Sequence, residues 1–241
     1  MNLDSFAFTT EGGRSYNEDF IAYRENGDRA IYVVADGLGG HLNGEMASAC
    51  VADSLICAWE SSGNEEWGKW LNEQTALANQ RLLELQREKR SNMKSTLATL
   101  LIDGQQAFWG NVGDSRVYYL HNRAVADITE DHSVAYKKYK AGQITKAQLG
   151  HDEDQSCLLR VLGNTERWEP DLYECGESIV PGDGFVLCSD GLWEYVYDEE
   201  ILIDFLKSET AREWAEHLLL RAIDRIQNDN DNMSLMTVIV S

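Results

Sequence analysis

The sequence predicts an α+β fold, in which antiparallel strands and helices occupy separate stretches of the chain. Strand-like runs with a period of two come in blocks, most clearly over Lys94–Ile128, and short separators rich in Gly, Asp or Asn divide them. Two long helical segments stand between the blocks, at Gly44–Trp59 and Glu65–Lys89. Strands grouped in this way are typical of antiparallel sheets rather than of a parallel βαβ sheet. We therefore expect α+β layers in a single domain over residues 1–241.

The first part of the chain is expected to form strands around a turn, followed by the two helices. Ala30–Ala35 (AIYVVA) is an apolar run that stops at Asp-Gly, which is typical of a buried strand. The two helical segments carry apolar residues at helical spacing, so each has a face that can pack on a sheet. The strands predicted here are Ser5–Thr9, Phe20–Tyr23 and Ala30–Ala35.

The second part of the chain begins with the antiparallel meander Lys94–Ile128. His132–Gln148 is polar and rich in lysine, and we predict a surface excursion that is helical at most. Alternating and continuous apolar runs then predict the remaining elements. They are strands at Trp168–Glu174 and Gly184–Cys188, helices at Asp198–Lys207 and Thr210–Gln227, and a last strand at Met233–Val240.

The charge and composition exclude several classes of protein. Asp and Glu number 41 against 21 Lys and Arg, and the net charge of −20 repels nucleic acid and anionic lipid. No run of apolar residues is long enough to span a membrane, and the N-terminal residues lack the pattern of a signal peptide. The five cysteines form no C-x-x-C pair, so we predict buried, reduced thiols in a cytoplasmic protein.

Two similar segments carry the first chemical signal. Val33–Leu38 and Leu187–Leu192 each run through apolar residues into Asp-Gly-Leu. A single Asp-Gly is usually a turn, but Asp36 and Asp190 both follow predicted strands, whose rigid ends can aim metal ligands. Further acidic residues stand at similar junctions between elements, namely Glu18, Asp19, Asp114 and Asp231.

This set of carboxylates predicts a site for hard cations. Aspartates without a Cys/His cluster favour Mg²⁺ or Mn²⁺ over zinc. Two such ions about 3.5–4 Å apart can share one water, lower its pKa and hold it for attack on phosphorus. Arg14 precedes Glu18 by four residues and is suited to hold the phosphate, although a lone arginine more often forms a surface salt bridge. An EF-hand is excluded around Asp231, because the required Gly and Glu are missing.

The ordered motifs resemble those of bacterial type 2C, metal-dependent (PPM) serine/threonine protein phosphatases. Each motif alone is weak, but together they occur in family order and cover nearly the whole chain. The matching stretches are Arg14–Asp19, Ala35–His41, Gly44–Ser48, Ser95–Thr96, Gly110–Arg116, Thr129–Ser133, Leu159–Gly163, Ser189–Trp193 and Asp231–Asn232.

The resemblance implies a fold and an activity. The fold is a four-layer αββα sandwich of two mostly antiparallel sheets with helices on both outer sides. The activity is that of a phosphoric monoester hydrolase acting on phosphoserine and phosphothreonine of proteins. Residues 133–156 fall where the family carries its flap, which borders the active site.

The resemblance also implies roles for individual residues around two Mn²⁺ or Mg²⁺ ions. Asp36 would bridge the two core ions, with the carbonyl of Gly37 as a further ligand. Asp190 and Asp231 would hold the first ion, which makes Asp36 and Asp190 catalytic residues.

The remaining roles concern the second ion, a possible third ion and the phosphate. Glu18 would act on the second ion, partly through water, and Asp19 would support the cluster. Asp114 would form a third metal position together with Asp190. Arg14 would bind the phosphate and count as catalytic.

The chain departs from some relatives at the proton donor. Those relatives have His directly after the bridging Asp-Gly, where this chain has Leu38. His41 follows three residues later, and we expect it to support the loop. The general acid therefore stays open, and a water molecule could serve.

Two rival functions are weighed against a phosphatase of this kind. An aspartyl-nucleophile phosphohydrolase needs a second Asp two residues after the first, but Leu38 and Leu192 stand there. A pseudophosphatase acting as a regulatory binding module would usually lose metal ligands, and none of the expected carboxylates is lost.

The expected partners follow from the activity. They are phosphorylated protein substrates and a cognate Ser/Thr kinase, in bacterial signalling or secretion control. The protein is expected to be a monomer. The sequence does not identify the pathway, and type VI secretion is only one guess.

Overall fold

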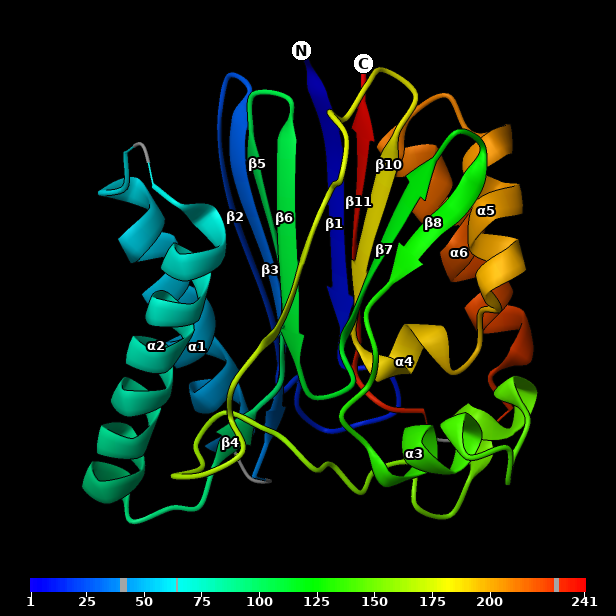
Figure 1. Ribbon diagram of the computed structural model, residues 1–241. Helices are drawn as coiled ribbons and strands as arrows, with labels where there is room; N and C mark the ends of the chain where they lie inside the picture. The colour runs from blue at the N-terminus through cyan, green and yellow to red at the C-terminus, as the bar shows by residue number, and fades with distance from the viewer. Residues whose placement is uncertain (40–42, 64, 228–229) are drawn as a thin grey trace.

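Two antiparallel β-sheets pack face to face and carry helices on both outer faces (Figure 1). The computed structural model describes residues 1–39, 43–63, 65–227 and 230–241. Side chains from both sheets meet in one buried apolar cluster, which includes Tyr32 and Leu100 of one sheet and Phe185 and Met236 of the other. The predicted α+β, four-layer αββα sandwich is confirmed.

The first sheet joins the two ends of the chain. Its order is β1 (Leu3–Thr10), β11 (Met233–Val240), β10 (Gly184–Cys188), β7 (Arg116–His121) and β8 (Ala124–Ile128). The second sheet has the order β2 (Asp19–Asn26), β3 (Arg29–Leu38), β5 (Leu97–Asp103), β6 (Gln106–Val112) and β9 (Asp171–Glu174), and β4 (Lys94–Ser95) pairs with β3.

Each sheet has its own pair of covering helices (Figure 1). α1 (Asn43–Glu60) and α2 (Trp67–Lys89) pack on the second sheet through an apolar cluster that includes Val51, Leu71 and Val33. α5 (Asp198–Lys207) and α6 (Ala211–Arg225) cover the first sheet in the same way. Short elements lie at the end of the sandwich away from the two termini, namely α3 (Val134–Lys140), the 3₁₀ helix η1 (Lys146–His151) and α4 (Asp190–Trp193).

The predicted meander Lys94–Ile128 is divided between the two sheets, so the prediction of one continuous meander was wrong. β5 and β6 belong to the second sheet, whereas β7 and β8 belong to the first. The chain crosses over at Gly113–Ser115, where Gly113 adopts a φ of +96° that other residues rarely accept. Asp114 therefore lies at a crossing between sheets rather than in a hairpin turn.

The two Asp-Gly-Leu segments have different local structures. β3 continues through Asp36 to Leu38, because Gly37 and Leu38 pair with Ser95 and Lys94 of β4. Asp36 is thus inside a strand and not at its end. Asp190 follows β10, as predicted, but it also begins the short helix α4, which was not predicted.

The predicted burial of the cysteines is largely wrong. Cys188 alone is buried, Cys50 and Cys175 are half-buried, and Cys57 and Cys157 are exposed. All five are free thiols in the structure. None of the helices in the described ranges has the length and apolarity needed to cross a bilayer.

Candidate active site

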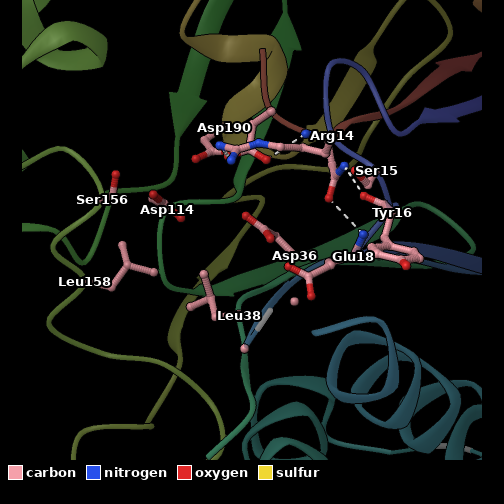
Figure 2. A pocket seen from close by; sticks show the side chains of 14 residues that line it. Arg14, Ser15, Tyr16, Glu18, Asp36, Leu38, Asp114, Ser156, Leu158 and Asp190 are labelled. Atoms are coloured by element: carbon pink, nitrogen blue, oxygen red, sulfur yellow. Dashed lines mark hydrogen bonds and ion pairs between the residues drawn. The ribbon is translucent and has the colours of Figure 1, made fainter. Parts of the chain in front are cut away.

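A cleft of about 390 Å³ opens at the end of the sandwich where α3 and α4 lie. It collects seven of the eight residues that the sequence singled out, and only Asp19 does not line it. Figure 2 shows Asp36 near the middle, with Asp114, Ser156 and Leu158 on one side and Tyr16 on the other. The predicted residues that line the cleft are Arg14, Glu18, Asp36, Gly37, Asp114, Asp190 and Asp231.

Asp36 is held by its backbone so that its side chain enters the cleft (Figure 2). Its N–H donates to Thr96 Oγ1 at 2.9 Å, and its carbonyl accepts from the Thr96 N–H at 2.8 Å. Burial raises the pKa of the Asp36 carboxyl well above its usual value, and the nearby carboxylates of Asp19 and Asp190 raise it further. Asp36 therefore stands where negative charge accumulates.

Asp19 lies behind the cleft wall, buried between the sheets. It is the partner of Asp36 on the neighbouring strand, and Ser189 Oγ donates to its Oδ2 at 2.7 Å. Its other oxygen, Oδ1, is buried and has no hydrogen-bond partner. Burial raises the pKa of Asp19 to about 6. Asp19 thus lies one layer behind the cleft, bonded to the residue that precedes Asp190.

Asp114 is fixed by the crossing between the two sheets. Trp193 Nε1 donates to its carbonyl at 2.8 Å, and the ring of Trp193 stacks 3.7 Å below the guanidinium of Arg116. Arg116 is in turn paired with Asp131 through two buried hydrogen bonds of 2.7 and 2.8 Å. Asp114 Oδ1 is buried without a partner, and burial together with Asp190 raises the pKa of Asp114 well above its usual value.

Asp190 contacts a glutamine and a glutamate that the sequence analysis missed. Gln155 Nε2 lies 3.4 Å from Asp190 Oδ2 and also donates to Glu194 Oε1. Burial, together with the charge of Asp231, raises the pKa of Asp190 to about 7. Burial, together with the charge of Asp190, raises the pKa of Glu194 to about 8. Glu194 stands four residues after Asp190, and this helical spacing was the available signal.

The side chain of Glu18 lies against the first turn of helix α1. Its Oε1 accepts from the Gly44 N–H at 3.2 Å, where the helix dipole favours a negative charge. Its carbonyl accepts from Ser48 Oγ at 2.6 Å and from the Gly37 N–H at 3.1 Å. Only glycine fits at position 37, because the Cβ of any other residue would lie 2.1 Å from the Gly44 carbonyl oxygen.

Arg14 is the only cationic side chain among the described residues that line the cleft. Its Nη2 lies 2.8 Å from Asp231 Oδ2, and the two side chains are 59% and 44% exposed. The guanidinium thus stands at the mouth of the cleft, where a phosphate group can reach it.

Within the described residues, the structure does not assign a side chain as the proton donor. Leu38 lines the cleft and has no proton to give. His41, which we expected to support the loop, lies outside the described residues, as do Gly40 and the Asn228–Asp229 part of the last acidic cluster. Ser156 and Leu158 complete the wall next to Asp114 (Figure 2).

The chemistry of the site fits a divalent cation that prefers oxygen ligands. Carboxylates repel one another unless protons or cations neutralise them, and two buried oxygens, Asp19 Oδ1 and Asp114 Oδ1, have no partner. Within the described ranges, no three His, Cys, Asp or Glu side chains form a ready metal site by themselves. A cation here would therefore also need a backbone carbonyl, such as that of Gly37, and water.

The chain is similar to known phosphatases over almost its whole length. The serine/threonine phosphatase stp of Listeria welshimeri is 33% identical over 244 residues, which cover 96% of this chain and 94% of the relative. Stp1 from Staphylococcus aureus is 29% identical, with a TM-score of 0.87 over 100% of this chain and 96% of that chain. The catalytic domain of PstP in complex with two manganese ions is 26% identical, with a TM-score of 0.83 over 98% of this chain and 97% of that chain.

A family model agrees with these likenesses. The model described as protein phosphatase 2C matches residues 11–223, which hold all the predicted site residues except Asp231. The sandwich of two sheets and the acidic cleft between their ends fit that match. The chain therefore belongs to the protein phosphatase 2C family of bacterial serine/threonine protein phosphatases.

Proposed function

We propose that this phosphatase hydrolyses phosphoserine and phosphothreonine on proteins with the help of two Mn²⁺ or Mg²⁺ ions in the cleft. The observation that carries the proposal is the convergence of five carboxylates and one guanidinium on a single cleft. Asp36 would hold both ions, with the Gly37 carbonyl as a further ligand. Asp190 and Asp231 would hold the first ion.

The other carboxylates complete the proposed metal centre. Glu18 would act on the second ion, and Asp19 would support Asp36 from behind. Asp114 and Asp190 would offer a third position, which the unpartnered Asp114 Oδ1 favours. The relative PstP has been solved with two manganese ions, which supports the choice of metal. Bound divalent ions lower the pKa of water and stabilise charge on phosphoryl oxygens.

The residues of the chain would orient the substrate. Arg14 would bind two phosphate oxygens with its planar guanidinium; its side chain is 59% exposed at the mouth of the cleft, where it now pairs with Asp231. In the reaction, the oxygen of water bonds to phosphorus while the bond from phosphorus to the serine or threonine oxygen breaks. The leaving oxygen takes up a proton. Leu38 cannot supply it, so we assign this proton to water in the cleft.

The substrate chemistry implies a partner reaction. Phosphoserine and phosphothreonine in proteins arise by phosphoryl transfer to a hydroxyl group, so a Ser/Thr kinase must act before this enzyme. We propose that the enzyme opposes such a kinase in signalling or secretion control, as a cytoplasmic monomer. We also propose that residues 1–241 form one catalytic domain whose flap is about residues 133–156.

A phosphopeptide assay with Mn²⁺ at neutral pH tests the proposal. We expect activity that EDTA abolishes and that Asp190→Ala lowers by about 100-fold or more. Asp127→Ala, on the edge strand β8, is the control and should stay active. Full activity in EDTA, or in the Asp190 variant, would contradict the proposal. Calorimetry without Mn²⁺ binding would favour a pseudophosphatase, and a trapped phosphoaspartate would favour an aspartyl nucleophile.

A further inference from the structure

Asn232 is a buried amide whose side-chain polar groups all bond to the backbone of the loop that carries Arg14. Its Oδ1 accepts from the Glu18 N–H at 2.8 Å. Its Nδ2 donates to the carbonyls of Glu11 at 2.9 Å and Tyr16 at 2.8 Å. The residue is only 4% exposed, so water does not compete for these bonds.

The same residue also contacts two further segments that line the cleft. Its backbone N–H donates to Asp231 Oδ1 at 2.8 Å and so orients that carboxylate. Its carbonyl oxygen lies so close to Gly191 that a Cβ there would be 2.0 Å away. Asn232 therefore joins the loop of residues 11–18 to both Asp231 and the turn that follows Asp190.

The other attachments of the loop are at exposed side chains or near its end. Arg14 pairs with Asp231, Asn17 bonds to Thr9, and the Glu18 carbonyl accepts from Gly37 and Ser48. Around the exposed residues Arg14, Ser15 and Tyr16, the Gly13 N–H donates to the Asn230 carbonyl outside the loop, and the Arg14 N–H donates to the Glu11 carbonyl within it. Without the three bonds from the Asn232 side chain, the backbone of the loop would lose its anchors on both sides of Arg14, at Glu11 and at Tyr16 and Glu18. The position of the phosphate-binding guanidinium thus depends on an amide that does not itself bind phosphate.

We infer that Asn232 is a positioning residue that fixes Arg14 and Glu18 relative to Asp190 and Asp231. The inference rests on the proposed function of those residues. An asparagine offers one acceptor and two donors on one plane, as the Glu18 N–H and two carbonyls require. An aspartate would place an oxygen against the carbonyls of Glu11 and Tyr16 and would repel them.

The test compares Asn232→Ala with a matched variant, Asn79→Ala. Asn79 is also 4% exposed, and its amide likewise bonds to backbone, at 2.7 Å from the Gly163 N–H and 2.9 Å to the Asn164 carbonyl. It lies on α2 and does not line the cleft. Both variants lose buried hydrogen bonds, so a purely structural role would affect both alike.

Three measurements separate positioning from stability. In Asn232→Ala, we expect hydrogen exchange of residues 11–18 in EDTA to become faster, and Asn79→Ala should leave it unchanged. The inhibition constant of inorganic phosphate should rise about tenfold and kcat/KM should fall about 100-fold, since small displacements of binding groups are costly. In an Arg14→Ala background, the added effect of Asn232→Ala on phosphate inhibition should be small.

Opposite results would overturn the inference. These are unchanged exchange in residues 11–18, a loss of phosphate affinity that Asn79→Ala reproduces, or full additivity with Arg14→Ala. Asn232→Asp should resemble Asn232→Ala, and wild-type behaviour of Asn232→Asp would also count against it. If the proposed function itself fails, the wild-type protein shows no Mn²⁺-dependent activity, whereas the exchange measurement still tests whether Asn232 holds the loop.

Discussion

Asp19 and Asp36 lie directly opposite each other on β2 and β3. Residues paired in this way on antiparallel strands present their side chains on the same face, so the two carboxylates share one small volume. Both have raised pKa values; burial is the largest cause, and the charge of Asp19 adds to the rise at Asp36. The site therefore carries more negative charge than it can stabilise without protons or cations.

Replacing Asp19 by asparagine should relieve this repulsion. The amide keeps an oxygen for the Ser189 hydroxyl, which now donates at 2.7 Å. We expect a higher Tm in EDTA and weaker Mn²⁺ binding, measured by thermal unfolding and calorimetry. Asp127→Asn, half-buried on β8, should change neither quantity. A lower Tm of Asp19→Asn in EDTA would argue against repulsion at this pair.

The pH dependence of the metal-free protein follows from the same charges. The folded pKa values of Asp19, Asp190 and Glu194 are raised to about 6, 7 and 8. Above about pH 4–5 the unfolded state has released these protons, whereas the folded state still holds them. Their stabilising contribution is complete below that pH and is lost as the pH rises through about 8, so the Tm in EDTA should fall between pH 5 and 8.

Metal binding should show the opposite trend with pH. A cation must displace the protons on these carboxyls, so Mn²⁺ affinity should rise as the pH increases from about 6 to about 8. Calorimetry in two buffers with different ionisation enthalpies would count the protons released. An affinity that does not change with pH would show that the carboxyls are already ionised in the metal-free protein.

Gly191→Ala should destabilise the protein, because a Cβ there would lie 2.0 Å from the Asn232 carbonyl oxygen. We expect a loss of about 1–3 kcal/mol or more in the free energy of unfolding, measured with denaturant. Gly68→Ala is the control, since nothing lies within 4 Å of its Cβ position on α2. That change should stabilise the helix by about 0.5–1 kcal/mol. Equal effects at the two positions would refute the close approach.

The buried pair of Arg116 and Asp131 should matter far more than a surface pair. Asp131→Ala leaves the guanidinium of Arg116 buried over Trp193 without its partner, and we expect a loss of about 3–5 kcal/mol. Glu60→Ala removes the exposed partner of Arg24 and should cost about 0–1 kcal/mol. Denaturant unfolding measures both, and similar losses would contradict the assigned role of burial.

Much of the fold could be predicted from periodicity, because most elements bury one face. β10, α5 and β11 have the same bounds as predicted, since polar or Gly residues flank each apolar run. The division of the meander between two sheets could not be predicted. The crossing at Gly113–Ser115 is as short as a hairpin turn, and only the packing of the sheets distinguishes them.

The site was predicted better than its surroundings. The motifs identified five carboxylates that the structure brings to one cleft, and Asp19 behind them. They did not reveal Gln155, whose closeness to Asp190 depends on how the chain around residue 155 folds against α4. They also did not reveal Glu194, although its helical spacing from Asp190 is visible in the sequence. The position of Asp36 within β3 was missed as well, because the pairing with β4 involves only Gly37 and Leu38.

The position of β11 has a consequence for the synthesis of the protein. Among the strands of the first sheet β11 is made latest, yet it lies inside that sheet, between β1 and β10. Asp231 and Asn232 directly precede it, so neither can take its place beside Arg14 until β11 is inserted. A nascent chain that still lacks these residues thus holds most of the sandwich but an incomplete cleft. Phosphatase activity should therefore appear only after β11 has been made and inserted.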